Sequence, residues 1–313
     1  MKRVVVALGG NALLSRDEDE SAEAMRTSAR HAAEVIADIA ASDWEVVVTH
    51  GNGPQVGRIL LQNEAARQFV SPMPLDVCGA ESQGQIGYLL QANIGDVFYE
   101  RGMERPVVTI LTLTRVPVDD PAFQDPTKPI GPHYREDEAQ RLMEQRGYQM
   151  KPASGNEGSW RRVVPSPHPY SIVEAPVIRT LVGDGVIVIS AGGGGVPVVE
   201  EGPRLVGVEA VVDKDLAAAI LAKDVEADVL LILTDVAGVF EGYGTPEQRL
   251  LPELSIEEAR RRMEAGEFGS GSMGPKVEAA VRFVDSGGER AVIAALADGT
   301  KALAGETGTR IVA

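Results

Sequence analysis

The sequence lacks the features of a secreted or membrane-embedded protein. Its single cysteine, Cys78, excludes an internal disulfide and fits a reducing cytoplasm. No apolar stretch approaches the ~20 residues that a membrane-spanning helix needs. The start Met1-Lys2-Arg3 leads straight into an apolar strand and predicts no secretory leader. We therefore expect a cytoplasmic protein that has no membrane partner.

Positive charge is scarce as well. The chain has 30 basic and 46 acidic residues and a net charge of −16. Such a chain repels nucleic acid unless its basic residues cluster, and the densest cluster, 260–262, lies among acidic neighbours in an expected helix. The four histidines lack metal-ligand spacing. His50, beside a glycine loop, is expected to make a structural hydrogen bond, and positioning of the substrate is the alternative. We expect no nucleic-acid partner.

Two common phosphate-binding motifs are absent, the Walker A loop and the G-x-G-x-x-G fingerprint. Instead, three glycine-rich loops each follow an apolar run. They are Gly9-Gly10-Asn11, His50 to Pro54, and Ala191 to Pro197. In open parallel sheets such loops meet beyond the carboxyl ends of the strands, where backbone N–H groups can bind an anion. Packing alone would also explain the first loop, and a flexible linker is the alternative for the four glycines 192–195.

Three lysines have surroundings that suit a phosphate site. Lys128 lies in a proline-fixed loop, and a surface lysine is an equally good explanation. Lys214 lies between Asp213 and Asp215 at an expected helix N-terminus, where a cation is unfavourable unless a bound anion or metal balances the charges. The alternative is that Lys214 forms only a local ion pair on the surface. Lys276 begins another helix, whose start signals leave the lysine itself unexplained.

Strand and helix patterns alternate along the chain, which predicts a mainly parallel sheet covered on both faces. We expect a single α/β domain over 1–313, a three-layer αβα sandwich. The expected strands are 3–8, 45–49, 106–111, 186–190, 229–233 and 291–295. The expected helices are 22–41, 54–69, 80–101, 172–183, 214–222, 255–264 and 276–286.

Residues 117–168 interrupt this alternation. The segment is rich in proline and contains one charged helix, Glu136 to Arg146. It predicts a small protruding lid subdomain that carries Lys128. We call residues 117–168 the lid segment.

Motifs along the whole chain carry a family resemblance. They are Val6 to Ala12, Thr49 to Gly57, Pro74 to Cys78, Ser82 to Gly84, Ile86 to Tyr88, Pro126 to Pro132, Trp160 to Pro167, Gly192 to Pro197, Gly207 to Asp215 and Gly271 to Ala280. Together they resemble the carbamate kinases of the amino acid kinase superfamily. The segment Pro126 to Pro132 is the most specific part of the resemblance.

The resemblance implies reversible phosphoryl transfer between ATP and carbamate, giving ADP and carbamoyl phosphate, with Mg²⁺ and in a homodimer. Lys128, Lys214 and Lys276 would then stabilise charge on the phosphoryl group, while Asp213 and Asp215 would organise the lysines or metal. Residues implied to contact the phosphoryl group or carbamate are Gly9, Gly10, Asn11, Gly51, Asn52 and Gly193. Residues implied near the nucleotide are Lys214, Tyr243, Gly244, Met273 and Lys276. No residue is assigned as a metal ligand.

Two segments, 154–159 and 233–246, differ from the family's usual pattern. They are expected to flank the substrate and the nucleotide, so two other hypotheses stay open. One is a kinase that acts on another small carboxylate, and the other is a non-catalytic sensor of nucleotide or acyl phosphate. The three lysines favour catalysis, because a sensor could lose them. Residues that differ from those usual in the family are Glu81, His168, Ala237, Gly242 and Thr245.

Overall fold

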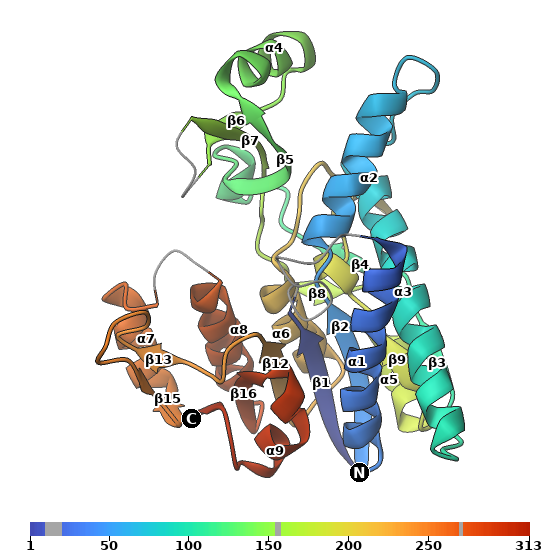
Figure 1. Cartoon of the computed structure of the whole chain (residues 1–313), viewed down its shortest axis with the longest axis vertical. Coiled ribbons are helices and arrows are strands. Elements are labelled where there is room, and N and C mark those ends of the chain that lie inside the picture. Colours follow the sequence, from blue (N-terminus) through green and yellow to red (C-terminus); the bar gives the residue numbers. More distant parts are fainter. Residues whose placement is uncertain (10–20, 154–157, 269–271) are drawn as a thin grey trace.

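The computed structural model describes residues 1–9, 21–153, 158–268 and 272–313 (Figure 1). Its strands are β1 (Lys2–Leu8), β2 (Trp44–His50), β3 (Val107–Thr109), β4 (Leu113–Arg115), β5 (Lys128–Arg135), β6 (Met150–Pro152), β7 (Ser159–Val164), β8 (Ser171–Ile172), β9 (Ile187–Ile189), β10 (Val196–Glu201), β11 (Arg204–Gly207), β12 (Val229–Thr234), β13 (Phe240–Glu241), β14 (Arg249–Leu250), β15 (Glu253–Ser255), β16 (Arg290–Ala295) and β17 (Thr309–Val312). Its helices are α1 (Ala22–Ala40), α2 (Gly53–Ala66), α3 (Leu75–Glu100), α4 (Glu136–Arg146), α5 (Ala175–Gly183), α6 (Lys214–Asp224), α7 (Ile256–Glu264), α8 (Met273–Asp285) and α9 (Gly299–Ala304), with 3₁₀ turns η2 (Pro121–Phe123), η3 (Gly192–Gly194) and η4 (Leu296–Asp298).

An eight-stranded sheet forms the centre, in the order β15-β17-β16-β12-β1-β2-β9-β3. Its pairs are parallel except for β16 with β17. All six expected strands are present in this sheet. The expected α/β fold with a mainly parallel sheet is confirmed.

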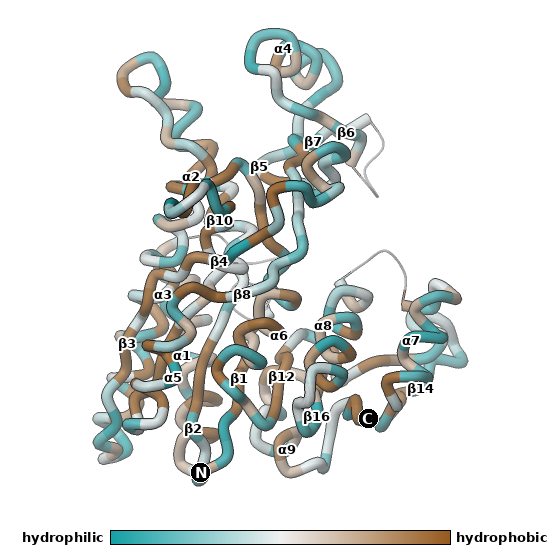
Figure 2. The backbone as a smooth tube through the Cα atoms, turned by 180° about the vertical axis from the view of Figure 1, so that it is seen from behind, coloured by the Kyte–Doolittle hydropathy of each residue, from teal (hydrophilic) through white to brown (hydrophobic). Residues whose placement is uncertain are grey.

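The central strands are apolar on both faces because helices cover both. In β1, Val4, Val6 and Leu8 belong to the core under α1 and α3. Val5 and Ala7 belong to the opposite core, together with residues of α5, α6 and α8. Figure 2 shows the hydrophobic central strands between these layers. The three-layer αβα arrangement follows from this double burial.

Three expected helices begin three or more residues from their predicted starts, among them α8, which begins at Met273 and not at 276. Helix α3 begins at Leu75, directly after Pro74, and not at residue 80. Helix α5 begins at Ala175 and not at 172, because Ser171 and Ile172 pair with β4 as strand β8. Proline in the first turn fits the start of α5, since its fixed φ is already helical and its missing N–H leaves no donor unpaired, whereas Pro74 is the extended N-cap of α3.

A second sheet was not expected from the sequence. Its four strands lie in the order β11-β10-β4-β8. Strand β4 is parallel to β10, and the remaining neighbours are antiparallel. These strands are two to six residues long, too short for an alternating pattern to distinguish them from loops.

The lid segment forms its own three-stranded sheet, β5-β7-β6, which carries α4. It protrudes from the central sandwich beside the far end of α2 (Figure 1). Helix α4 is mainly hydrophilic in Figure 2, and within it only Ala139 is buried. The charged helix predicted from the sequence has the observed bounds, whereas movement of the segment stays a prediction.

Within the described ranges of the chain, no helix combines the length and the apolar character that a membrane crossing requires.

Candidate functional site

A cavity of about 870 Å³ lies between the lid segment and the ends of the central strands. Eight of the residues selected from the sequence line it, although they come from distant parts of the chain. These are Gly51, Asn52, Lys128, Gly193, Asp213, Lys214, Asp215 and Lys276.

Three helices begin at this cavity. Gly53 at the start of α2, Lys214 at the start of α6 and Ser272 just before α8 all line it. A helix N-terminus carries partial positive charge and unpaired N–H groups, so it favours a bound anion. Three N-termini at one cavity create an electrostatic environment that suits a multiply charged anion such as a phosphate ester.

Lys128 and Asp213 link the lid segment to α6. Lys128 begins β5, and its Nζ donates a hydrogen bond of 2.7 Å to Asp213 Oδ2. The other oxygen of Asp213 caps α6 by accepting from the Asp215 N–H at 2.9 Å. Burial would raise the pKa of Asp213, but Lys128 and this N–H outweigh burial and lower the pKa below its ordinary value. Asp213 therefore stays ionised and holds Lys128 at the cavity.

Asp215 bridges the other two lysines. Its Oδ1 lies 2.6 Å from Lys214 Nζ and its Oδ2 lies 3.2 Å from Lys276 Nζ. Asp215 is 3% exposed and Lys276 only 4%. Burial and the nearby charge of Lys214 lower the pKa of Lys276, while Asp215 opposes this shift. The lysine that helix-start chemistry left unexplained is thus a buried cation at the cavity.

The charges of this cluster do not cancel. Three lysines face two carboxylates, Asp213 and Asp215, so the cluster carries one net positive charge. An excess positive charge in a partly desolvated cluster is unfavourable, and an anion bound in the cavity would remove that cost.

The glycine run 192–195 is structural. Gly193 has a φ of +63°, and a Cβ there would lie 2.1 Å from Asn52 Nδ2. Asn52 in turn donates a 2.8 Å hydrogen bond to Ser82 Oγ, which fixes the amide at the cavity. Any side chain at residue 193 would displace Asn52. The linker alternative is wrong, because Gly192, Gly193 and Gly194 form the buried turn η3.

His50 is a buried neighbour of the cavity. Its Nδ1 makes the expected structural hydrogen bond, to Gly51 O at 2.9 Å. Its ring lies so close to Gly192 that a Cβ there would be 2.4 Å away. Burial, together with the charge of Lys214, lowers the pKa of His50 to about 4, against a favourable contribution from the Gly51 carbonyl. His50 is therefore neutral at pH 7.

Two glycine amides that were expected to face an anion have other partners. The N–H of Gly9 donates to Leu233 O at 2.8 Å, and that of Gly51 donates to Leu8 O at 3.2 Å. Both hydrogen bonds continue the pairing of the central strands beyond their ends, so these amides stabilise the sheet. Gly10 and Asn11 lie outside the described residues.

Of the residues implied near the nucleotide, Lys214 and Lys276 line this cavity, whereas Tyr243, Gly244 and Met273 do not. Tyr243 is 66% exposed, with its ring centroid 6.0 Å from that of Phe240. The N–H of Gly244 donates to Gln248 Oε1. Met273 begins α8 and packs against the core on that side of the sheet. Their role at the nucleotide stays a prediction.

Sequence reasoning missed several residues that line the cavity. They are Arg58 of α2, Gly131 and His133 of β5, and Arg161 of β7. The adjacent arginines 161 and 162 in a short apolar context were the available signal. Which of the two faces the cavity depends on strand pairing, which the sequence alone does not reveal.

The described cavity offers cations and helix N-termini, and the protein's one cysteine does not line it. Cys78 belongs to a separate core with Val56 and Leu75, and burial, followed by nearby carboxylates, raises its pKa to about 11. A thiol with that pKa is a poor nucleophile. The arrangement suits direct transfer of a phosphoryl group between two bound anions.

Comparisons with known proteins agree with this chemistry. Residues 2–295 match the sequence model of the amino acid kinase family. Carbamate kinase of Pyrococcus furiosus is 53% identical over 313 residues, covering 99% of each chain. Carbamate kinase of Halobacterium salinarum is 52% identical, covering 100% of this chain and 99% of that protein. The structure of carbamate kinase from Giardia lamblia bound to AMP-PNP has a TM-score of 0.93 at 44% identity, covering 99% of this chain and 98% of that one.

Proposed function

Because the chain belongs to the amino acid kinase family and is related along its whole length to carbamate kinases, we propose that it is a carbamate kinase. It transfers a phosphoryl group reversibly between ATP and carbamate, giving ADP and carbamoyl phosphate. The observation that carries the proposal is the cluster of Lys128, Lys214 and Lys276 at a cavity where three helices begin. The cytoplasm, which contains ATP, is the expected compartment.

The chemistry needs charge compensation more than proton transfer. A carboxylate oxygen of carbamate attacks the γ-phosphorus of ATP, the bond from that phosphorus to the β–γ bridging oxygen breaks, and ADP leaves. Lys214 and Lys276, at the starts of α6 and α8, stabilise the negative charge on the phosphoryl oxygens. Lys128 approaches from the lid segment and stabilises the same group from the other side.

Mg²⁺ enters this proposal as part of the substrate, bound to the nucleotide phosphates. Among the described residues, no group of three or more histidine, cysteine, aspartate or glutamate side chains could hold a metal ion. Asp213 and Asp215 are already paired with lysines. Magnesium in kinases is usually bound by substrate phosphates, water and one or two carboxylates, which agrees with this donor set.

ATP formation from ADP and carbamoyl phosphate, measured with luciferase, tests the proposal. We expect ATP to appear in proportion to enzyme and to depend on Mg²⁺. The variant Lys276→Ala is the control for contaminating kinase, because it removes one cation of the cluster. A folded wild-type protein that binds nucleotide but forms no ATP would instead support the sensor hypothesis.

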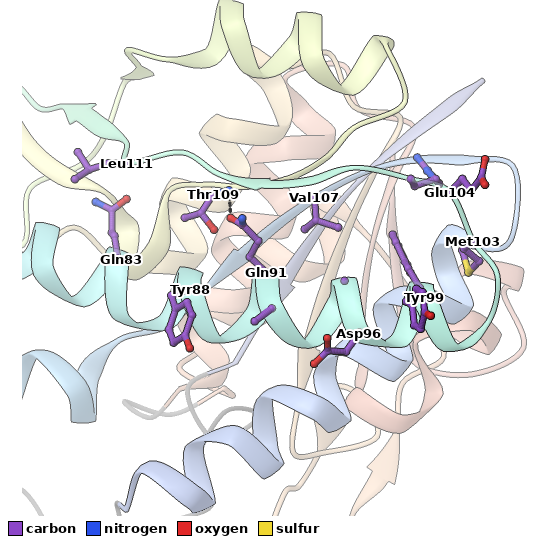
Figure 3. Close-up of a pocket in the computed structure, with 15 residues that line it drawn as sticks. Gln83, Tyr88, Gln91, Asp96, Tyr99, Met103, Glu104, Val107, Thr109 and Leu111 are labelled. Carbon is purple, nitrogen blue, oxygen red and sulfur yellow. Dashed lines mark hydrogen bonds between the residues drawn. The ribbon is translucent and has the colours of Figure 1, made fainter.

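The outer face of α3 supports the proposed homodimer (Figure 3). Strand β3 is the last strand of the central sheet, and a cavity of about 900 Å³ lies between α3 and residues 103–111. Tyr88 and Tyr99 are 59% and 89% exposed there, and Leu111 is 50% exposed. An unpaired sheet edge beside exposed aromatic side chains is typical of an interface. We propose that a second copy of this chain packs on it through a two-fold axis.

Substitution of a small residue on this face tests the dimer. A side chain at Gly95 meets no atom within 4 Å in one chain, so Gly95→Arg should fold normally yet place a charge in the interface. We expect light scattering to give twice the chain mass for wild type and for the control Gln145→Arg on α4, and one chain mass for Gly95→Arg. A wild-type monomer would contradict the proposal.

A further inference from the structure

Arg161 and Arg162 are neighbours in β7 with opposite surroundings. The guanidinium of Arg162 pairs with Glu209 at 2.9 Å and lies 4.0 Å from the ring centroid of Tyr148. Arg161 lines the cavity instead. Successive side chains of a strand point to opposite faces, which separates the two arginines. Arg162 therefore stabilises the lid segment, while Arg161 is free to contact a ligand in the cavity.

Arg161 has no ion-pair partner in the described part of the chain. Its Nη2 donates to Gly131 O at 2.8 Å, and its Nε is buried without an acceptor there. Burial lowers the pKa of Arg161, and no carboxylate opposes the shift. Lys128, Lys214 and Lys276, by contrast, each have a carboxylate within 3.2 Å. Arg161 thus lacks the counterion that each of these lysines has.

A bulge in β5 brings Arg161 close to α2. The pairing of β5 with β7 shifts register between Ile130 and Tyr134, so Gly131 to His133 lie outside the regular ladder and line the cavity. A Cβ at Gly57 of α2 would lie 3.6 Å from Gly131 Cα. The Arg161 hydrogen bond to Gly131 therefore fixes the guanidinium near α2, whereas Lys276 and Ser272 belong to the start of α8.

We propose that Arg161 binds the small acid of the reaction, carbamate or the carbamoyl end of carbamoyl phosphate, and not the nucleotide. The inference rests on the proposed function. In-line transfer requires donor and acceptor at opposite ends of the cavity, and the nucleotide is expected at the α8 end. A guanidinium can bind a carboxylate or phosphate through two parallel N–H groups, which fits its unpaired N–H groups. Arg161 would thereby add its charge to that of the three lysines and select a small oxyanion.

Initial rates of ATP formation by Arg161→Ala test the proposal. We expect the KM for carbamoyl phosphate to rise about tenfold or more, with the KM for ADP within about twofold of wild type. Arg161→Lys should recover only part of the loss, because an ammonium keeps the charge but not the planar pair of donors. The matched control is Arg162→Ala, which should lower the melting temperature and leave both KM values nearly unchanged.

Two outcomes would overturn the inference. An unchanged KM for carbamoyl phosphate in folded Arg161→Ala would mean that Arg161 only holds Gly131 in place. Equal increases in the KM values for carbamoyl phosphate and ADP would lead to the same conclusion. Calorimetry with phosphonoacetamide, in which a methylene replaces the bridging oxygen, separates this inference from the proposed function. Loss of its binding in Arg161→Ala supports the subsite even if the wild type makes no ATP, and unchanged binding refutes it.

Discussion

Lys276 shows at the scale of one residue how the fold creates a reactive charge. An ammonium that is 4% exposed would be unfavourable alone, and it is stabilised by Asp215 and by the Ser272 carbonyl at 3.3 Å. Asp215 also holds Lys214, so one buried carboxylate positions two cations. Because these groups are already oriented, they need no reorganisation as charge develops on the phosphoryl group.

The first prediction concerns these two lysines. Lys214→Ala and Lys276→Ala should each lower kcat by about 100-fold or more, comparable to loss of one oxyanion-hole donor. Steady-state kinetics of ATP formation measures the effect, with circular dichroism to verify folding. Lys223→Ala, at the opposite end of α6, is the control that should keep full activity. An unchanged kcat in a folded variant would remove that lysine from the mechanism.

The second prediction concerns His50 and pH. Its folded pKa of about 4 is below the unfolded value of 6.5, so the unfolded chain binds the proton first as pH falls. The stability that neutral His50 provides is complete above pH 6.5 and is lost progressively towards pH 4. The loss amounts to about 3 kcal/mol of the free energy of unfolding.

Urea unfolding at pH 7 and pH 4.5 measures this loss. The free energy of unfolding of wild type should fall between pH 7 and pH 4.5. In His50→Gln, whose side chain cannot take up a proton, this fall should be smaller by about 2 to 3 kcal/mol. The same pH dependence in both proteins would contradict the buried, neutral state of His50.

At the scale of elements, the lid segment connects to the sandwich through few polar contacts. Lys128 bonds to Asp213 of α6, Arg146 of α4 pairs with Glu64 of α2 at 3.2 Å, and Arg162 reaches Glu209. Ile130 and Val164 of this small sheet also pack in one apolar core with Val56 of α2. We therefore expect closure to exchange ion pairs around this apolar contact and to leave the sheet's own ladder intact. We expect substrates to draw it towards the cavity through Lys128.

The third prediction follows from that movement. Lys128→Ala should reduce turnover while leaving the affinity for ADP nearly intact, because the nucleotide is expected against α6 and α8. Calorimetry measures ADP affinity, and limited proteolysis of the lid segment, with and without substrates, measures closure. Equal protease sensitivity in both states, or a large loss of ADP affinity, would refute a mobile lid.

The elements that the sequence predicted correctly are those with strong local signals. Strand β1 contains the continuous apolar run Val4 to Leu8, and α6 begins directly after the capping residue Asp213. Strands β4 and β8 were not predicted, because they are short and depend on pairing between distant segments. The position of Arg161 at the cavity was not predicted for the same reason, since the bulge in β5 is visible only once β5 and β7 are paired.

At the scale of the whole molecule, the sheet topology assembles the site. Strands β1 and β2 are neighbours, with β12 and β9 on either side, so the loops that follow them open at one edge. Helices α2, α6 and α8 begin at the cavity at this edge, although they are far apart in sequence. The glycine-rich loops predicted this convergence, whereas the use of the Gly9 and Gly51 amides within the sheet was visible only in three dimensions.

The central claim is that this cavity transfers a phosphoryl group to and from carbamate in preference to other small acids. The most direct test is the ratio of kcat/KM for carbamoyl phosphate to kcat/KM for acetyl phosphate, both measured with ADP and Mg²⁺ in one coupled assay. We predict a preference of about tenfold or more for carbamoyl phosphate, because a site that binds a polar group rejects an analogue lacking it. A clear preference for acetyl phosphate, or for another acyl phosphate in the same panel, would contradict the account.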